Sequence, residues 1–193
     1  MNAIFLQSGY VLKRQGLAIA AKYRLTGLQG EPLLFIEEKI KWIPPSTSVH
    51  MYADEKKTRE VLTFKDGKSA DVGTDIFDAE SGQKIGGIGT TADNLAEFIK
   101  DAWVIVDAED KPVAKVAERS TGQSIARELL SHDLPQQLDI KVGETLVAEL
   151  RQKVKLAGYE LEIDFSMDTA NLLDHRLGIA AAVHVALHQG REV

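Results

Sequence analysis

The chain has 193 residues, 44% of them hydrophobic and 27% charged, a composition typical of a globular protein and not of a disordered one. It contains no cysteine, which excludes disulfides, thiolate chemistry and lipid anchors on cysteine. The formal net charge of −6 argues against nonspecific nucleic-acid binding. We find neither a signal-peptide pattern nor an apolar run of the about 20 residues that a bilayer span needs. We therefore expect one domain over residues 1–193, cytoplasmic or peripheral to a membrane.

Most of the chain alternates apolar and polar residues with the period of a β-strand. Three clear examples are LAIAAKYRL at 17–25, PLLFIEEKIKWI at 32–43 and GYELEIDFS at 158–166. Each places its apolar residues on one face, so each predicts a strand that is buried on one side. Glu38 interrupts the apolar face of its stretch, which we interpret as a bulge or a position at the rim of a barrel.

Turn-forming residues recur at short intervals between these stretches. They occur in TGLQGEP, KDGKS, DAESGQ, DAEDKP and KVGET. Gly, Asp, Asn and Pro supply the backbone angles of tight hairpins, so the spacing predicts about eleven or twelve antiparallel strands. Residues 121–131 instead have the apolar spacing of a short amphipathic helix, and residues 94–103 fit either a helix or a strand.

The C-terminal stretch DHRLGIAAAVHVALHQG, residues 174–190, predicts a helix without a polar face. From Leu177 to Leu187 every residue is apolar or glycine except His184. A helix at a protein surface has a polar side, so this helix is expected to be surrounded by protein. Asp168 or Thr169 is the predicted N-cap and Gly190 the predicted end.

Small residues make this helix thin enough to lie inside a barrel. A helix of about 16 residues is about 24 Å long, which is close to the length of a seven-residue strand. We therefore predict a mainly β protein, a closed antiparallel barrel of about twelve strands around a central hydrophobic C-terminal helix. The alternative is a helix packed between two open sheets.

Several stretches resemble the LURP-one-related proteins and their bacterial relatives, a family of the tubby C-terminal-like group that also includes the phospholipid scramblases. The matching stretches are LLFIEEKIKW, VHMYADEKKTREVLTF, IFDAESGQKIGGI, AWVIVDAEDKPVAKVAE, YELEIDFSMD and DHRLGIAAAVHVAL. They extend from about Tyr10 to Gly190. The resemblance implies a twelve-stranded barrel around a central helix. It implies no particular activity, because a shared fold does not carry a shared function.

Three patterns in the sequence have features of sites for metal or nucleotide chemistry. His184 and His188 stand at i and i+4, a spacing that allows two imidazoles to share a metal, but Val185 replaces the glutamate of zinc proteases and no third ligand is evident. DFSMDTANLLDH lies where scramblases have a calcium-binding segment, yet its EF-hand-like spacing fails at Thr169 and His175. The glycines of GGIGTTA more simply bend a strand. We therefore predict no metal site, no cofactor and no enzymatic activity.

Basic residues in the first third give the strongest functional indication. Residues 1–59 hold nine of the 23 Lys and Arg residues but five of the 29 Asp and Glu residues, a local charge of +4. Lys22 and Arg24 alternate along the polar face of one predicted strand, and Lys39 and Lys41 along that of the next. Tubby-like domains that read phosphoinositide headgroups use lysines and arginines on the barrel exterior. The resemblance thus implies a phospholipid-headgroup site at these four residues.

Three functional hypotheses follow. The first is a non-enzymatic binding module that docks reversibly on anionic phospholipid headgroups. The second is a barrel that binds a protein partner and no small ligand, with its basic residues serving only solubility. The third, scramblase-like lipid translocation, rests on the resemblance alone and ranks last.

Overall fold

The computed structural model describes residues 3–16, 20–42, 45–67, 72–90, 103–119, 136–153 and 158–189. A short 3₁₀ helix, η1 (Ala3–Leu6), precedes twelve strands, and helix α3 (His175–Gln189) follows them. The strands are β1 (Gly9–Arg14), β2 (Lys22–Gly27), β3 (Pro32–Trp42), β4 (Pro45–Tyr52), β5 (Glu60–Asp66), β6 (Thr74–Asp78), β7 (Lys84–Gly89), β8 (Trp103–Val106), β9 (Pro112–Glu118), β10 (Gln137–Val142), β11 (Thr145–Lys153) and β12 (Glu160–Asp164). The helix expected at 121–131 lies outside the described residues. Of the stretch that fits either a helix or a strand, residues 94–102 also lie outside them, and Trp103 begins β8.

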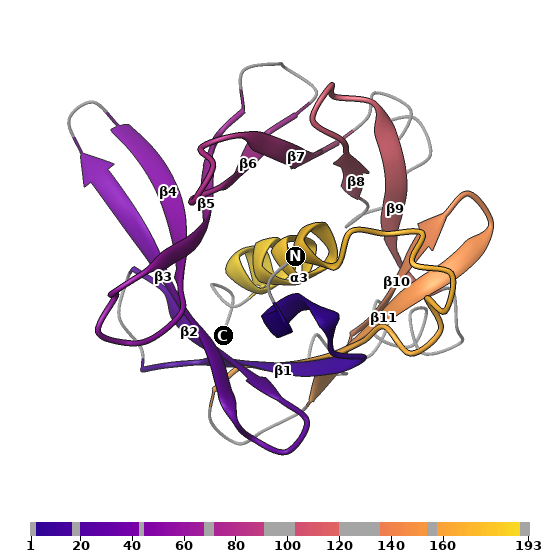
Figure 1. Ribbon diagram of the computed structural model, residues 1–193, viewed down its shortest axis with the longest axis horizontal. Helices are drawn as coiled ribbons and strands as arrows, with labels where there is room; N and C mark the ends of the chain where they lie inside the picture. The colour runs from indigo at the N-terminus through magenta and orange to yellow at the C-terminus, as the bar shows by residue number, and fades with distance from the viewer. Residues whose placement is uncertain are drawn as a thin grey trace, which may run out of the picture.

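The twelve strands form a closed antiparallel barrel. Each strand pairs with its neighbours in the chain, and β1 pairs with β12 to close the ring. Figure 1 shows the strands encircling α3. The predicted barrel is thus confirmed, and the alternative of two open sheets is wrong. Closure removes the free sheet edges that an open arrangement would expose.

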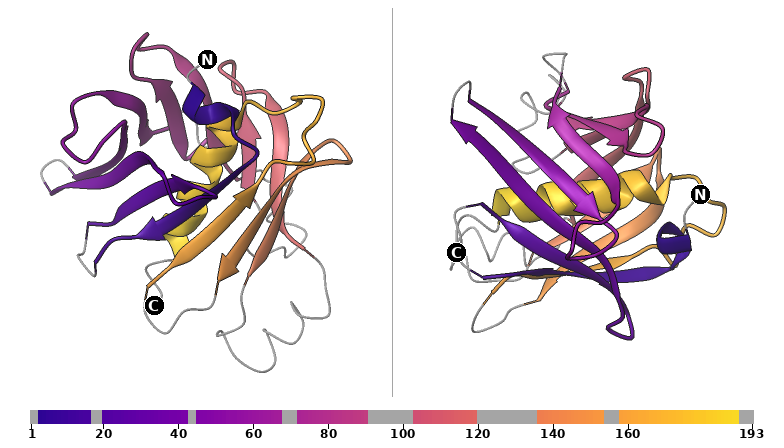
Figure 2. Two further views of the ribbon diagram at one scale, coloured as in Figure 1. Left: turned by 60° about the horizontal axis from the view of Figure 1, so that its bottom comes forward. Right: turned by 60° about the vertical axis from the view of Figure 1, so that its left-hand side comes forward.

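From Leu177 to Leu187 the residues of helix α3 are buried by the barrel, with the exception of the partly buried His184. Ile179, Ala180, Ala182, Val183 and Ala186 have no exposed surface. Two views from other directions show the helix running through the ring of strands (Figure 2). Tyr23 on β2 donates a hydrogen bond of 2.8 Å from its hydroxyl to the carbonyl of Ala186, which fixes the helix to the wall. The polar end of this buried tyrosine is thereby satisfied.

Glycine at one wall position allows the helix to approach closely. A Cβ atom at Gly86 on β7 would lie 2.4 Å from the carbonyl oxygen of Val106 and 2.9 Å from a side-chain methyl of Leu177 on α3. Both distances are shorter than real Cβ contacts. Gly86 therefore serves close packing, and β7 is antiparallel to both its neighbours, unlike the parallel strand that a dinucleotide-binding loop follows.

The predicted helix start at Asp168 or Thr169 is wrong, because the cap is Asp174. The Asp174 side chain accepts a hydrogen bond of 2.9 Å from the amide of Arg176, and its carbonyl accepts from Leu177. Asp168 is engaged elsewhere, accepting hydrogen bonds from two backbone amides of the turn before the helix. Gly190 lies outside the described residues.

Candidate functional site

Lys22, Arg24, Lys39 and Lys41 lie on the outer surface of β2 and β3, here called the outer basic face. Along both strands they alternate with side chains that point into the core, such as Tyr23 and Ile36. The strands are antiparallel, with Lys22 opposite Glu37 and Arg24 opposite Phe35. The two pairs of cations are therefore offset along one surface, as the sequence predicted.

Carboxylates neutralise the β2 part of this face. Glu37 lies 3.5 Å from the Lys22 ammonium and accepts a hydrogen bond of 2.5 Å from Lys57, which the β4–β5 turn brings over β3. Although partial burial opposes the shift, Lys57 and Lys22 together hold the pKa of Glu37 below its usual value. Arg24 forms an ion pair with Glu55 of the same turn. Both β2 cations are thus already paired.

On the β3 part of the face, the positive charges are less fully neutralised by carboxylates. Lys39 donates a hydrogen bond of 2.9 Å to the hydroxyl of Tyr52, and its ammonium lies 5.7 Å from the centroid of that ring. Lys41 is exposed and makes no ion pair with any of the described residues. Lys39 and Lys41 are therefore the members of the outer basic face most available to an external anion.

A second candidate site arises where the barrel wall splits between β4 and β5. The pairing of these strands runs from Tyr52 to Val49 on β4 and stops where Val49 meets Phe64. Beyond this point β4 remains paired with β3 as far as Pro45, while β5 remains paired with β6 as far as Asp66. The β3–β4 hairpin consequently leans away from the rest of the ring, as Figure 1 shows.

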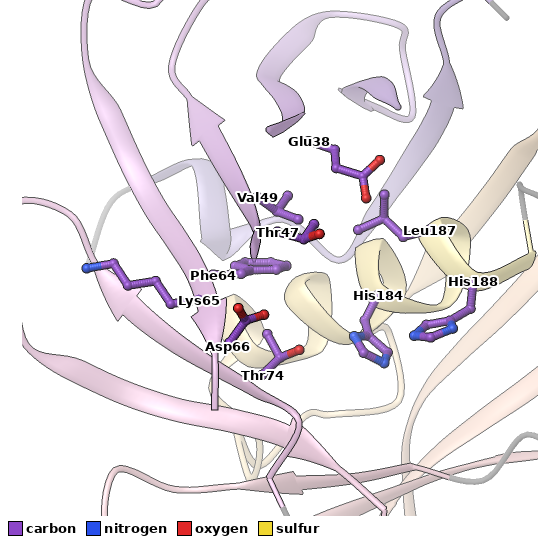
Figure 3. Close-up of a pocket in the computed structure, with 10 residues that line it drawn as sticks. All are labelled: Glu38, Thr47, Val49, Phe64, Lys65, Asp66, Thr74, His184, Leu187 and His188. Atoms are coloured by element: carbon purple, nitrogen blue, oxygen red, sulfur yellow. The ribbon is translucent and has the colours of Figure 1, made fainter. Parts of the chain in front are cut away.

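A cavity of about 190 Å³ opens in this split, and we call it the mouth cavity. One side is β3 and β4, the other is β5 and β6, and the last turns of α3 form the back wall (Figure 3). Its lining combines carboxylates, imidazoles, hydroxyls and apolar side chains. The lining residues are Glu38, Thr47, Val49, Phe64, Lys65, Asp66, Thr74, His184, Leu187 and His188.

Glu38 is the acidic residue that interrupts the apolar face of β3. It is only 2% exposed, and its carboxylate accepts a hydrogen bond of 3.1 Å from the amide of Ala21. The amide of Glu38 in turn donates to the carbonyl of Ala21. The sequence marked Glu38 as exceptional but did not reveal that it lines a cavity, because the cavity depends on the separation of β4 from β5.

His184 and His188 lie side by side on the back wall. Their ring centroids are 4.5 Å apart, and Trp103 on β8 lies 6.0 Å from His184 and 6.3 Å from His188. Burial lowers the pKa of His184 to about 3, with a further contribution from His188. Its imidazole is therefore uncharged at neutral pH. Within the described ranges, His, Asp and Glu side chains form no group of three that could hold a metal ion.

The segment between β12 and α3, whose sequence partly resembles a calcium-binding loop, is held by contacts within the protein. Asp164 accepts a hydrogen bond of 2.9 Å from the amide of Ser166. Asp168 is 3.6 Å from the Nε2 atom of His175, whose ring stacks on Phe165 with centroids 4.2 Å apart. These contacts are those of a strand end and a turn leading into a helix, the simpler of the two interpretations of the sequence.

Among the described residues, no helix is both long and apolar enough to cross a bilayer. Comparison of the chain with protein-family models, with curated proteins and with solved structures finds no match.

Proposed function

We propose that this chain is a non-catalytic, tubby-like barrel of the LURP-one-related type that docks reversibly on anionic phospholipid headgroups through its outer basic face. The twelve strands around a C-terminal helix support the relationship. The observation that carries the docking proposal is the exposure of Lys41, with Lys39 beside it on the same strand, on a hairpin that leans out from the barrel.

The charges around this hairpin favour an anionic surface. The β2 and β3 exterior, the β4–β5 turn and the first residue of β5 together carry seven cationic side chains and four carboxylates. The cations are Lys22, Arg24, Lys39, Lys41, Lys56, Lys57 and Arg59, and the carboxylates are Glu37, Asp54, Glu55 and Glu60. The net positive charge contrasts with the −6 of the whole chain and would orient the barrel at a negatively charged membrane.

The proposal is tested by co-sedimentation with phosphatidylcholine vesicles that contain or lack phosphatidylserine, at low and at physiological salt. We expect binding only to the vesicles with phosphatidylserine, and weaker binding at the higher salt because screening shortens the range of the interaction. Each lysine near such a surface contributes about 1 kcal/mol, so K39E combined with K41E should weaken binding by roughly 30-fold or more.

The matched control places the same charge change elsewhere on the barrel. Lys115 on β9 and Lys141 on β10 are exposed and lie opposite each other in the register, so K115E with K141E alters the net charge equally. This variant should bind vesicles nearly as the unmodified protein does. Equal loss in both double variants would show that net charge alone governs binding. Absence of binding at either salt would overturn the proposal and favour a protein partner.

A further inference from the structure

The mouth cavity is a built feature of the fold and lies on the inner side of the wall, apart from the outer basic face. It exists because β4 and β5 separate while each keeps its other neighbour. Its volume of about 190 Å³ is below the roughly 300–1,000 Å³ of pockets for drug-sized ligands. The space therefore suits a molecule with only a few heavy atoms.

The register of the strands places a carboxylate at each end of this cavity. Glu38 lies opposite Val49, and Val49 lies opposite Phe64, so these three residues form one row across β3, β4 and β5. Asp66 follows Phe64 by two residues towards the open end. Figure 3 shows Glu38 and Asp66 at opposite ends of the lining, with Val49 and Phe64 between them.

Glu38 and Asp66 start from well-separated positions on the barrel wall. Two strand spacings of about 4.8 Å and two residues of about 3.3 Å place the Cα atoms of Glu38 and Asp66 about 12 Å apart. The side chains of both residues enter the same cavity from these positions (Figure 3). A chain of about four carbons with an amine at each end offers one ammonium donor to each carboxylate, whereas a monoamine offers a single donor.

The remaining lining suits the middle of such a molecule. Val49, Phe64 and Leu187 supply apolar surface for methylene groups, and the two threonines supply hydroxyls. The ammonium of Lys65 lies 4.8 Å from the Phe77 ring centroid and so is held by an interaction of its own. Asp66 forms no ion pair with any residue in the described part of the chain. The lining thus carries two acceptors for cations with apolar surface between them.

We propose that the mouth cavity binds a small organic dication of the α,ω-diamine class, with one ammonium group at Glu38, the other at Asp66 and the alkyl chain against Val49, Phe64 and Leu187. This site is independent of headgroup docking, because it uses none of the residues of the outer basic face. A diamine bound there would also bridge the two edges of the split between β4 and β5.

Isothermal titration of the full chain with diaminobutane tests this proposal, with butylamine and butanediol as matched probes of one charge and of none. We expect saturable binding of diaminobutane, at least tenfold tighter than that of butylamine, and no binding of butanediol. Comparable heats for all three probes, or no saturable binding of diaminobutane, would overturn the proposal.

Three variants locate the binding. E38Q retains an oxygen acceptor for the Ala21 amide but removes the charge, and D66N removes the charge at the exposed end. Each should weaken diaminobutane binding at least tenfold, whereas E144Q in the exposed β10–β11 turn should leave it unchanged. Should E38Q fail to fold, D66N still decides, because Asp66 is exposed. Unaltered affinity of D66N would exclude the proposed site.

Discussion

His184 shows how a single, largely enclosed side chain acquires unusual chemistry from its position. The ring is packed against Trp103 and His188 near the end of a helix inside the barrel. Burial disfavours the imidazolium form, so its pKa falls from 6.5 to about 3. The ring can accept or donate hydrogen bonds in the mouth cavity without adding a positive charge to it.

This environment predicts a specific pH dependence of stability. Between pH 6.5 and about 3 the unfolded chain binds a proton at His184 that the folded chain does not, so acidification favours unfolding. The stability that depends on the neutral form of His184 is fully present above pH 6.5. It is lost as the pH falls, at up to about 1.4 kcal/mol per pH unit. Chemical denaturation at several pH values between 5 and 7 measures this dependence. The free energy of unfolding should change less with pH for H184Q than for the unmodified protein.

Proton NMR provides the direct check. The ring signals of His184 should remain constant from pH 8 to pH 5, with the assignment made by comparison with H184Q. A midpoint near 6.5 would mean that the ring is solvated and that the back wall of the mouth cavity is open.

For single residues, the sequence indicated which face of a strand a side chain occupies better than which residues that side chain contacts. Alternation along the strands placed Lys39 and Lys41 on the outside, because the strand period is strict. It could not show that Glu55 and Lys57 fold back from the next turn onto Arg24 and Glu37. Those contacts depend on the path of a turn, which local patterns do not define.

Helix α3 is the element whose environment was easiest to infer. An apolar helix with no polar face has to be enclosed, and its small residues indicate close neighbours on all sides. Its start was harder to place, because Asp168 and Asp174 are both good caps by type. Contacts of Asp168 with the preceding turn decide between them, and these contacts are not visible in the sequence.

Enlarging the side chains of this helix should overpack the barrel. A181L and A182L should each lower the free energy of unfolding by roughly 1–3 kcal/mol, since both alanines are at most 1% exposed. Urea denaturation of both variants measures the change. A108L in the exposed β8–β9 turn is the matched control and should alter stability little. Unchanged stability of A181L and A182L would contradict enclosure of the helix.

At the scale of the whole molecule, the number of strands followed from the turn signals, but the closure of the ring required more. Most pairs join strands adjacent in the chain, as hairpins dictate. The pairing of β1 with β12 joins residues separated by nearly the whole sequence, and no local pattern specifies it. The inference of closure came from the helix, which needs a wall on every side. The split between β4 and β5 had no such indirect signal.

Closure makes the first strand dependent on the last. Tyr10 and Leu12 of β1 lie opposite Ile163 and Leu161 of β12, and all four side chains are buried. Releasing β1 would therefore expose core residues and leave two unpaired sheet edges, so this seam should open only when the whole barrel unfolds. Native-state hydrogen exchange should give the amides of β1 and β12 that face each other the same opening free energy as those between β10 and β11. Much faster exchange at the β1–β12 seam would mean that the ring opens there first, and that the sheet around the helix can separate locally between β1 and β12.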